Sequence, residues 1–292
     1  MGRSKAHYWF VGPAIFLMLL LLIAPVFVAA ALSMTDYSLG NSGFNWIGWE
    51  NYEKLFSRRS YSKMFTASLT YVLLVVPISV ALGLGSALLI SSLRIGGELY
   101  KAIFFLPVMA TLLAMAIVWE FALNPIVGVV NDILRSGCDK SAIYALLSGS
   151  WLGYDPLESW YGSACEKKFP LWLGDRQYAL GTIAFIGIWQ AFGFNMVLYL
   201  AGLTSVPREL YQAAQMDGAD SAWERFKLVT WPMLGPTHVF VITISSIRSF
   251  QVFDTVEALT EGGPSKSTYV MVYAMFEKGV RQNLLGMGSA IT

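Results

Sequence analysis

The segment YALGTIAFIGIWQAFGFNMVLYLAGLTSVP, from Tyr178 to Pro207, carries no charged side chain. It is followed at once by the polar segment RELYQAAQMDGADSAWERFKLVTWPMLGP, from Arg208 to Pro236. About 20 mostly apolar residues are enough for a helix to cross a bilayer. The first segment is therefore predicted to span a membrane, and the second is predicted to lie outside it.

Four more segments have the length and apolar character of membrane spans. Uncharged runs extend over Val11–Leu32, Met64–Leu93 and Ala102–Trp119, and Thr237–Thr255 is apolar except for Arg248 and Asp254. Pro77 and Pro107 lie inside such runs, and spans tolerate proline where neighbouring helices satisfy the freed backbone groups. The pattern predicts an all-α polytopic membrane protein with five spans in this chain.

The composition agrees with a membrane protein. The 292 residues are 55% hydrophobic and only 13% charged, whereas about 25% charged residues is usual for soluble domains. A net charge of +1 offers no basic surface for nucleic acid. Neither a Cys/His cluster nor a P-loop motif occurs, so we expect no metal site and no cofactor in this chain.

The orientation follows from the first span. Arg3 and Lys5 precede it, and the next basic residue after it is Lys54. Charges beside the first span usually set the topology, so we place the N-terminus in the cytoplasm, although a count of all Lys and Arg residues favours the opposite. A cleaved signal peptide ending near Ala29–Ala31 is the alternative, but the apolar run exceeds the usual 7–15 residues.

The polar segment has the pattern of two short helices. Pro207 and Glu209 suit the first turn of one helix, and Leu210, Ala213 and Ala214 form an apolar stripe on it. Gly218 is able to adopt a positive φ and end that helix.

A second helix starting at Ala219 is predicted to carry one apolar face, and Pro232 is predicted to interrupt it. The residues on that face are Ala222, Trp223, Phe226 and Val229.

This segment resembles the "EAA" loop of binding-protein-dependent ABC importer permeases. The residues at the family positions are Ala213, Ala214, Asp217, Gly218, Ala219, Phe226, Pro232 and Pro236. Gln212 stands where the family has Glu, which removes one charge. The resemblance implies that residues 207–236 dock on an ATPase subunit and transmit its movement. An ordinary surface loop is the alternative interpretation.

Further motifs extend the resemblance over nearly the whole chain. Asn51-Tyr52 with Leu55-Phe56, Phe250–Asp254, and Leu259–Pro264 are similar to segments of sugar-type permeases, near the disaccharide and glycerol-3-phosphate members. These permeases normally have six spans, and the last would begin near Gly288. The resemblance implies one transmembrane permease domain over residues 1–292, with an extracytoplasmic insertion at 120–177.

The family also implies the partners. We expect a second permease subunit of similar fold, a dimer of ATPase subunits that binds ATP and Mg, an extracytoplasmic solute-binding protein, and the bacterial cytoplasmic membrane. The chain itself would be no enzyme. A sugar or oligosaccharide is the expected solute, and glycerol phosphate or another anion is the alternative. An ion-coupled secondary transporter is an alternative of another class, and a membrane-anchored structural or sensor protein is a third.

Polar side chains in the last two spans indicate a substrate path, because ionisable groups in a membrane are costly and usually functional. Aromatic faces pack on sugar rings, and amide and guanidinium groups hydrogen-bond hydroxyls. The predicted path residues are Trp189, Asn195, Tyr199, Arg248, Gln251 and Asp254. An Arg248–Asp254 ion pair, an interhelical role for Asn195, and simple packing of Trp189 and Tyr199 remain open.

The two cysteines lie in the predicted extracytoplasmic insertion. Disulfides form and persist on that side of the membrane, so Cys138 and Cys165 are predicted to be bonded. Such a bond would contribute about 3–4 kcal/mol in the chain-entropy model. Two free thiols are the alternative.

Overall fold

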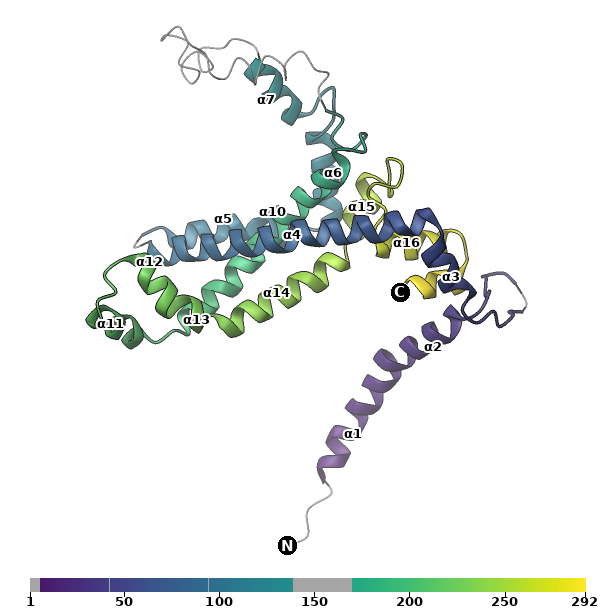
Figure 1. Cartoon of the computed structure of the whole chain (residues 1–292), viewed down its shortest axis with the longest axis horizontal. Helices are drawn as coiled ribbons and strands as arrows, with labels where there is room; N and C mark the ends of the chain where they lie inside the picture. The colour runs from purple at the N-terminus through teal and green to yellow at the C-terminus, as the bar shows by residue number, and fades with distance from the viewer. Residues whose placement is uncertain (1–5, 42, 94, 139–169) are drawn as a thin grey trace. The chain divides into compact units, whose positions relative to one another are not determined.

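The structure is a computed structural model that describes residues 6–41, 43–93, 95–138 and 170–292 (Figure 1). The chain divides into two compact units, residues 1–66 with 269–292 and residues 67–268. Helix α4 (Arg59–Ser92) begins in the first unit and ends in the second. The predicted disulfide lies outside the described residues, because Cys165 belongs to 139–169 and only the backbone of Cys138 is described, at the end of α7 (Val129–Cys138).

Four of the five predicted spans are confirmed as long apolar helices. Within the described ranges, the helices long and apolar enough to cross a membrane are Val11–Ser33, Arg59–Ser92, Ala179–Thr204 and Gly235–Leu259.

The third predicted span, Ala102–Trp119, is not one straight helix. It is divided between α5 (Gly97–Met109) and α6 (Leu112–Ala122), which are inclined at 99° to each other. The backbone is extended at Ala110 and Thr111, with ψ of 138° and 139°. Two successive extended residues end the helical hydrogen-bond ladder, which the apolar sequence alone did not indicate.

The last span is also interrupted. Helix α14 (Gly235–Phe250) ends just before Gln251, and α15 (Asp254–Leu259) starts three residues later. Gly235–Leu259 as a whole is still long and apolar enough to cross a membrane, but Arg248 and Asp254 lie on separate helical segments. Phe253, with φ −141° and ψ −60°, is not helical and separates the two helices.

In the first unit, an apolar helix leads to a small helical cluster. The helix consists of α1 (Ala6–Met18), η1 (Leu19–Ile23) and α2 (Ala24–Ser33), where η1 is a π-helical segment. The cluster consists of α3 (Glu50–Ser57), α16 (Met271–Phe276), η4 (Glu277–Arg281) and α17 (Leu285–Ile291).

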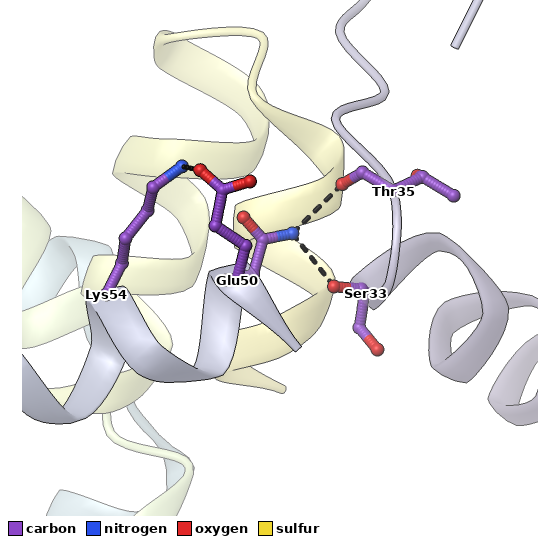
Figure 2. Close-up of polar contacts among 5 residues, drawn as sticks. Ser33, Thr35, Glu50 and Lys54 are labelled. Atoms are coloured by element: carbon purple, nitrogen blue, oxygen red, sulfur yellow. Dashed lines mark hydrogen bonds and ion pairs between the residues drawn. The ribbon is translucent and has the colours of Figure 1, made fainter. Parts of the chain in front are cut away.

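Figure 2 shows how the end of α2 is held against α3. The Asn51 side-chain amide donates hydrogen bonds to the carbonyl oxygens of Ser33, at 2.8 Å, and Thr35, at 2.9 Å. Helix ends leave such carbonyls without intrahelical partners. Glu50 and Lys54 form an ion pair one turn apart on α3. The Asn51-Tyr52 motif therefore has a structural role at this point.

In the second unit, α10 (Ala179–Thr204) is the central helix. It packs against α5 on one side and α14 on another, while α15 packs against α6. Glycine allows the closest approach, because a Cβ at Gly193 would lie 2.1 Å from the Phe104 carbonyl oxygen. Six buried side chains form the core of these contacts: Ala87, Ile90, Met196, Tyr199, Leu234 and Val241.

Candidate functional site

The polar loop after α10 folds as a helical hairpin. Helix α11 (Arg208–Met216) starts after Pro207 and ends two residues before Gly218, which has the predicted positive φ, here 90°. The Ala219 N–H donates to the Ala214 carbonyl at 2.9 Å, and the Gly218 N–H donates to the Gln215 carbonyl at 3.1 Å. This pair of bonds is the Schellman motif, which needs a left-handed residue such as glycine.

The second half of the hairpin differs from the prediction. Helix α12 (Ala222–Arg225) begins three residues after Ala219, where the Ser221 side chain and Glu224 form a capping box. The pKa of the Glu224 carboxyl group is lowered by its hydrogen bonds with Ser221. The bond from the Ser221 backbone N–H has the largest effect, and the bond with the Ser221 side chain comes next. The capping box has a readable sequence signature, S-x-x-E, which the prediction missed.

The helix continues through η3 (Phe226–Thr230), a π-helical turn, into α13 (Trp231–Met233). Pro232 therefore does not interrupt it, and lies two residues after the end of the π-helical turn. A π-helical turn shifts the helical register. Val229 is buried but Trp223 is 68% exposed. Trp223 stacks on Phe226, with ring centroids 5.3 Å apart, so the predicted apolar face forms in part.

The hairpin has a small core and a broad exposed face. Val206, Ala214, Ala219 and Val229 are buried together, with Tyr211 packed against them. The predicted stripe is only partly right, because Leu210 and Ala213 are exposed. Of the predicted coupling residues, Ala214 and Ala219 are buried and Phe226 is half-buried, whereas the exposed ones are Gln212, Ala213, Asp217, Gly218 and Pro232. Large apolar side chains such as Met216, 89% exposed, add to that face.

A chain of aromatic contacts leads from this hairpin into the spans. The ring centroids of Phe226 and Trp231 are 5.9 Å apart, those of Trp231 and His238 are 4.3 Å apart, and those of His238 and Tyr199 are 5.4 Å apart. His238 Nδ1 and Tyr199 Oη also share a hydrogen bond at 3.0 Å. Tyr199 is fully buried in α10. The hairpin is thus packed through α14 onto the central helix.

A cavity of about 330 Å³ lies among α4, α5, α10, α14 and α15 of the second unit. Four predicted path residues line it, namely Asn195, Arg248, Gln251 and Asp254. Trp189 and Tyr199 are not among its lining residues. Trp189 packs instead against Trp119, with ring centroids 5.5 Å apart, and Tyr199 belongs to the buried core.

Asn195 connects three helices at the cavity wall. Its Nδ2 donates to Ser79 Oγ on α4 at 3.2 Å, and its Oδ1 accepts from Ser245 Oγ on α14 at 2.9 Å. A Cβ on Gly83 would lie 2.6 Å from the Asn195 Cβ, so α4 and α10 are in close contact here. These bonds support the interhelical role for Asn195.

The charged residues at the cavity are exposed and separate. The Arg248 guanidinium lies 4.0 Å from the centroid of the Phe194 ring, a cation–π contact. Among the described residues, Arg248 and Asp254 form no ion pair. Both side chains are therefore able to contact a solute in the cavity.

Sequence reasoning missed several residues of this site. Ser245 and Ser249 line the cavity, and their spacing of four residues on one helix was a usable signal. His238 is a lone histidine in an apolar stretch, a second signal. Ser79 had none, because its contact with Asn195 joins residues 116 positions apart.

Comparison with known proteins identifies the family of this helical fold. Residues 81–291 match the family model described as "Binding-protein-dependent transport system inner membrane component". The chain belongs to that family. It is a membrane permease subunit of an ABC transporter, and no catalytic subunit.

Similar permeases match almost the whole chain. The trehalose/maltose transport system permease protein MalF of Thermococcus litoralis is 30% identical over 99% of this chain and 88% of its own length. The sn-glycerol-3-phosphate transport system permease protein UgpA of Agrobacterium fabrum is 25% identical over 97% of this chain and 87% of its own.

A solved structure shows the same fold. In a bacterial ABC transporter that imports the acidic polysaccharide alginate, one chain superposes with a TM-score of 0.74 at 22% identity. The match covers 99% of this chain and 89% of that one. The overall helical arrangement expected from the sequence is thereby confirmed.

Proposed function

We propose that this permease passes a sugar or oligosaccharide, delivered by an extracytoplasmic binding protein, across the bacterial cytoplasmic membrane. A second permease subunit and a dimer of ATPase subunits, which bind ATP and Mg, complete the importer. The N-terminus and the 207–236 hairpin lie in the cytoplasm. The observation that carries this proposal is the continuous packing from an exposed hairpin face, through His238 and Tyr199, to the helix that lines the cavity.

The hairpin has the properties of a docking element. Its exposed face combines the apolar Met216 and Trp223 with the small Ala213 and Gly218. Apolar and aromatic residues dominate the binding energy of most interfaces. Because Gln212 carries no charge, shape and apolar contact hold this face in a groove of the ATPase.

Movement of the ATPase reaches the cavity through packed side chains. A shift of the hairpin displaces Trp231, which presses on His238 and through it on Tyr199. Tyr199 lies one helical turn from Asn195, which fastens α10 to α4 and α14. Interlocked contacts of this kind switch between discrete arrangements rather than deforming continuously. Closure of the ATPases on ATP would thereby open the cavity to the outer side.

The cavity has the chemistry for a hydroxyl-rich solute. Gln190 and Gln251 offer amide donors and acceptors, Asp254 accepts, and Phe194 offers a ring face. A relative that is named for trehalose and maltose is similar over the whole length of this chain. Arg248 supports the second candidate, an anionic solute such as glycerol phosphate, because Asp254 does not neutralise it among the described residues.

Uptake by proteoliposomes tests the proposal. The importer with its ATPase and binding protein is expected to accumulate labelled disaccharide only when ATP is inside. Arg248→Gln is expected to reduce uptake of an anionic solute at least tenfold and that of a neutral sugar much less. Uptake driven by an ion gradient without ATP would contradict the proposal and favour a secondary transporter.

A further inference from the structure

A second cavity, of about 750 Å³, lies at the loop end of the second unit. Its wall is built where α4 ends and α5 starts, and where α10 ends and α11 starts. Figure 1 shows that the start of α5 and helix α11 lie at the same end of this unit. Since α4 and α10 both have the length and hydropathy of spans, we place this end of the unit near the lipid headgroups.

The cavity has an apolar base and a polar entrance. Ile90 is buried in its wall, and Leu200, Leu203 and Val206 add apolar surface. Gly96, with φ 83°, makes the turn into α5 without a side chain, which leaves space in the cavity.

Two basic side chains, Lys101 and Arg208, and one acidic side chain, Glu98, stand in this wall. Arg208 forms no ion pair among the residues that the structure describes, and its side chain is exposed. Lys101 pairs with Glu98 at 2.7 Å, but the Glu98 side chain is 89% exposed. Exposed ion pairs contribute only about 0–1 kcal/mol, so an anion in the cavity is able to compete for Lys101.

We propose that this cavity binds the phosphate headgroup of an anionic membrane lipid, with Lys101 and Arg208 contacting the phosphate and the apolar wall contacting the start of the acyl chain. Basic pockets between transmembrane helices are suited to such headgroups. A lipid fits better than a free anion because the polar entrance matches the headgroup and the apolar base matches the acyl chain.

The position of the cavity gives the lipid an effect on the hairpin. Tyr211 on α11 lines the cavity and shares a 3.0 Å hydrogen bond with Thr230 Oγ1 on η3. A bound headgroup would therefore stabilise the first turn of α11 and, through Tyr211, the contact between the two halves of the hairpin.

Native mass spectrometry of the purified importer tests the proposal, with phosphatidylglycerol, phosphatidylcholine and inorganic phosphate as probes. The importer is expected to retain phosphatidylglycerol preferentially. Lys101→Gln and Arg208→Gln are each expected to weaken its retention about fivefold, because a basic residue near the membrane surface contributes about 1 kcal/mol. Lys227→Gln is the control, since it removes an equal charge from an exposed site that does not line the cavity.

Three results would overturn the proposal. Equal loss of phosphatidylglycerol in the Lys227→Gln control would show a general charge effect. Displacement of the lipid by millimolar inorganic phosphate would assign the site to a free anion. Release of the ATPase by the Lys101 and Arg208 variants with lipid retention unchanged would make the cavity a protein contact. None of these outcomes depends on which solute is transported.

Discussion

At the scale of single residues, Ser245 and Ser246 on α14 are adjacent but do different things. Ser245 Oγ donates to Asn195 on another helix at 2.9 Å, whereas Ser246 Oγ donates to the Ile242 carbonyl of its own helix. Only the first bond holds two spans together. A comparison of the two serines therefore distinguishes the effect of a hydrogen bond between helices from that of a bond within one helix.

We expect Ser245→Ala to destabilise the permease by about 0.6 kcal/mol, the average for hydrogen bonds between membrane helices, and by no more than about 1.7 kcal/mol, their maximum. Ser246→Ala is expected to change stability by less. The free energy of unfolding of each variant is measured by denaturant titration of the purified protein in detergent. Equal stability of the two variants would show that the bond between Ser245 and Asn195 adds nothing beyond a bond within one helix.

The capping box at Ser221 is a second residue-scale feature. Its hydrogen bonds lower the pKa of Glu224, so the ionised box is intact at neutral pH and is lost as the pH falls through that lowered pKa. Ser221→Ala is expected to cost about 1 kcal/mol locally. Amide hydrogen exchange over residues 221–226 should accelerate about fivefold, while Ser205→Ala, whose hydroxyl only contacts its own helix at Gly202, should leave it unchanged.

At the scale of elements, close helix contacts depend on glycine. In the first unit α17 packs on α2, and a Cβ at Gly286 would lie 2.1 Å from the Thr35 carbonyl oxygen. Gly85 in α4 has no atom within 4 Å of the same position. Substitution by alanine is therefore expected to have opposite effects on stability at Gly286 and at Gly85.

Gly286→Ala is expected to destabilise the protein by about 1–3 kcal/mol, because the added methyl forces the backbone apart. Gly85→Ala is expected to be neutral or to stabilise by up to about 1 kcal/mol, since alanine is the better helix former. Thermal unfolding in detergent compares them. A neutral Gly286→Ala variant would mean that α17 does not pack on α2 as described.

The contact between α14 and α10 carries the proposed coupling. His238 and Tyr199 share one hydrogen bond, so His238→Phe, Tyr199→Phe and the double variant should lose nearly the same amount of binding-protein-stimulated ATP hydrolysis. Additive losses, measured as a double-mutant cycle, would mean that the two residues act independently. Basal hydrolysis without binding protein is expected to change little.

At the scale of the whole molecule, hydropathy was enough to predict the helical fold and four spans. It did not predict the break at Ala110, which lies in an uncharged run, or the one at Gln251, which lies between Arg248 and Asp254. Only the backbone torsions show these two breaks. At the loop, Gly218 could be predicted from its residue type. The π-helical turn at Phe226 could not, and neither could the difference in exposure between Trp223 and Val229.

Only part of the candidate site could be predicted from the spacing of residues along single helices. Arg248, Gln251 and Asp254 reach one cavity although the helix between them is broken. Tyr199 has the right residue type for a sugar contact, but tertiary packing places it in the core. Spacing along one helix indicates which residues are neighbours, and it does not show what the opposite helix contributes.

The most direct test of the central claim is the ATP hydrolysis of the reconstituted importer with and without solute-loaded binding protein. Gly218→Pro and Gly40→Pro each replace an exposed glycine, with φ of 90° and 98°, by a residue that cannot adopt it. We expect Gly218→Pro to abolish most of the stimulation by binding protein, and Gly40→Pro to keep it. Undiminished stimulation in the Gly218→Pro importer would contradict coupling through the 207–236 hairpin.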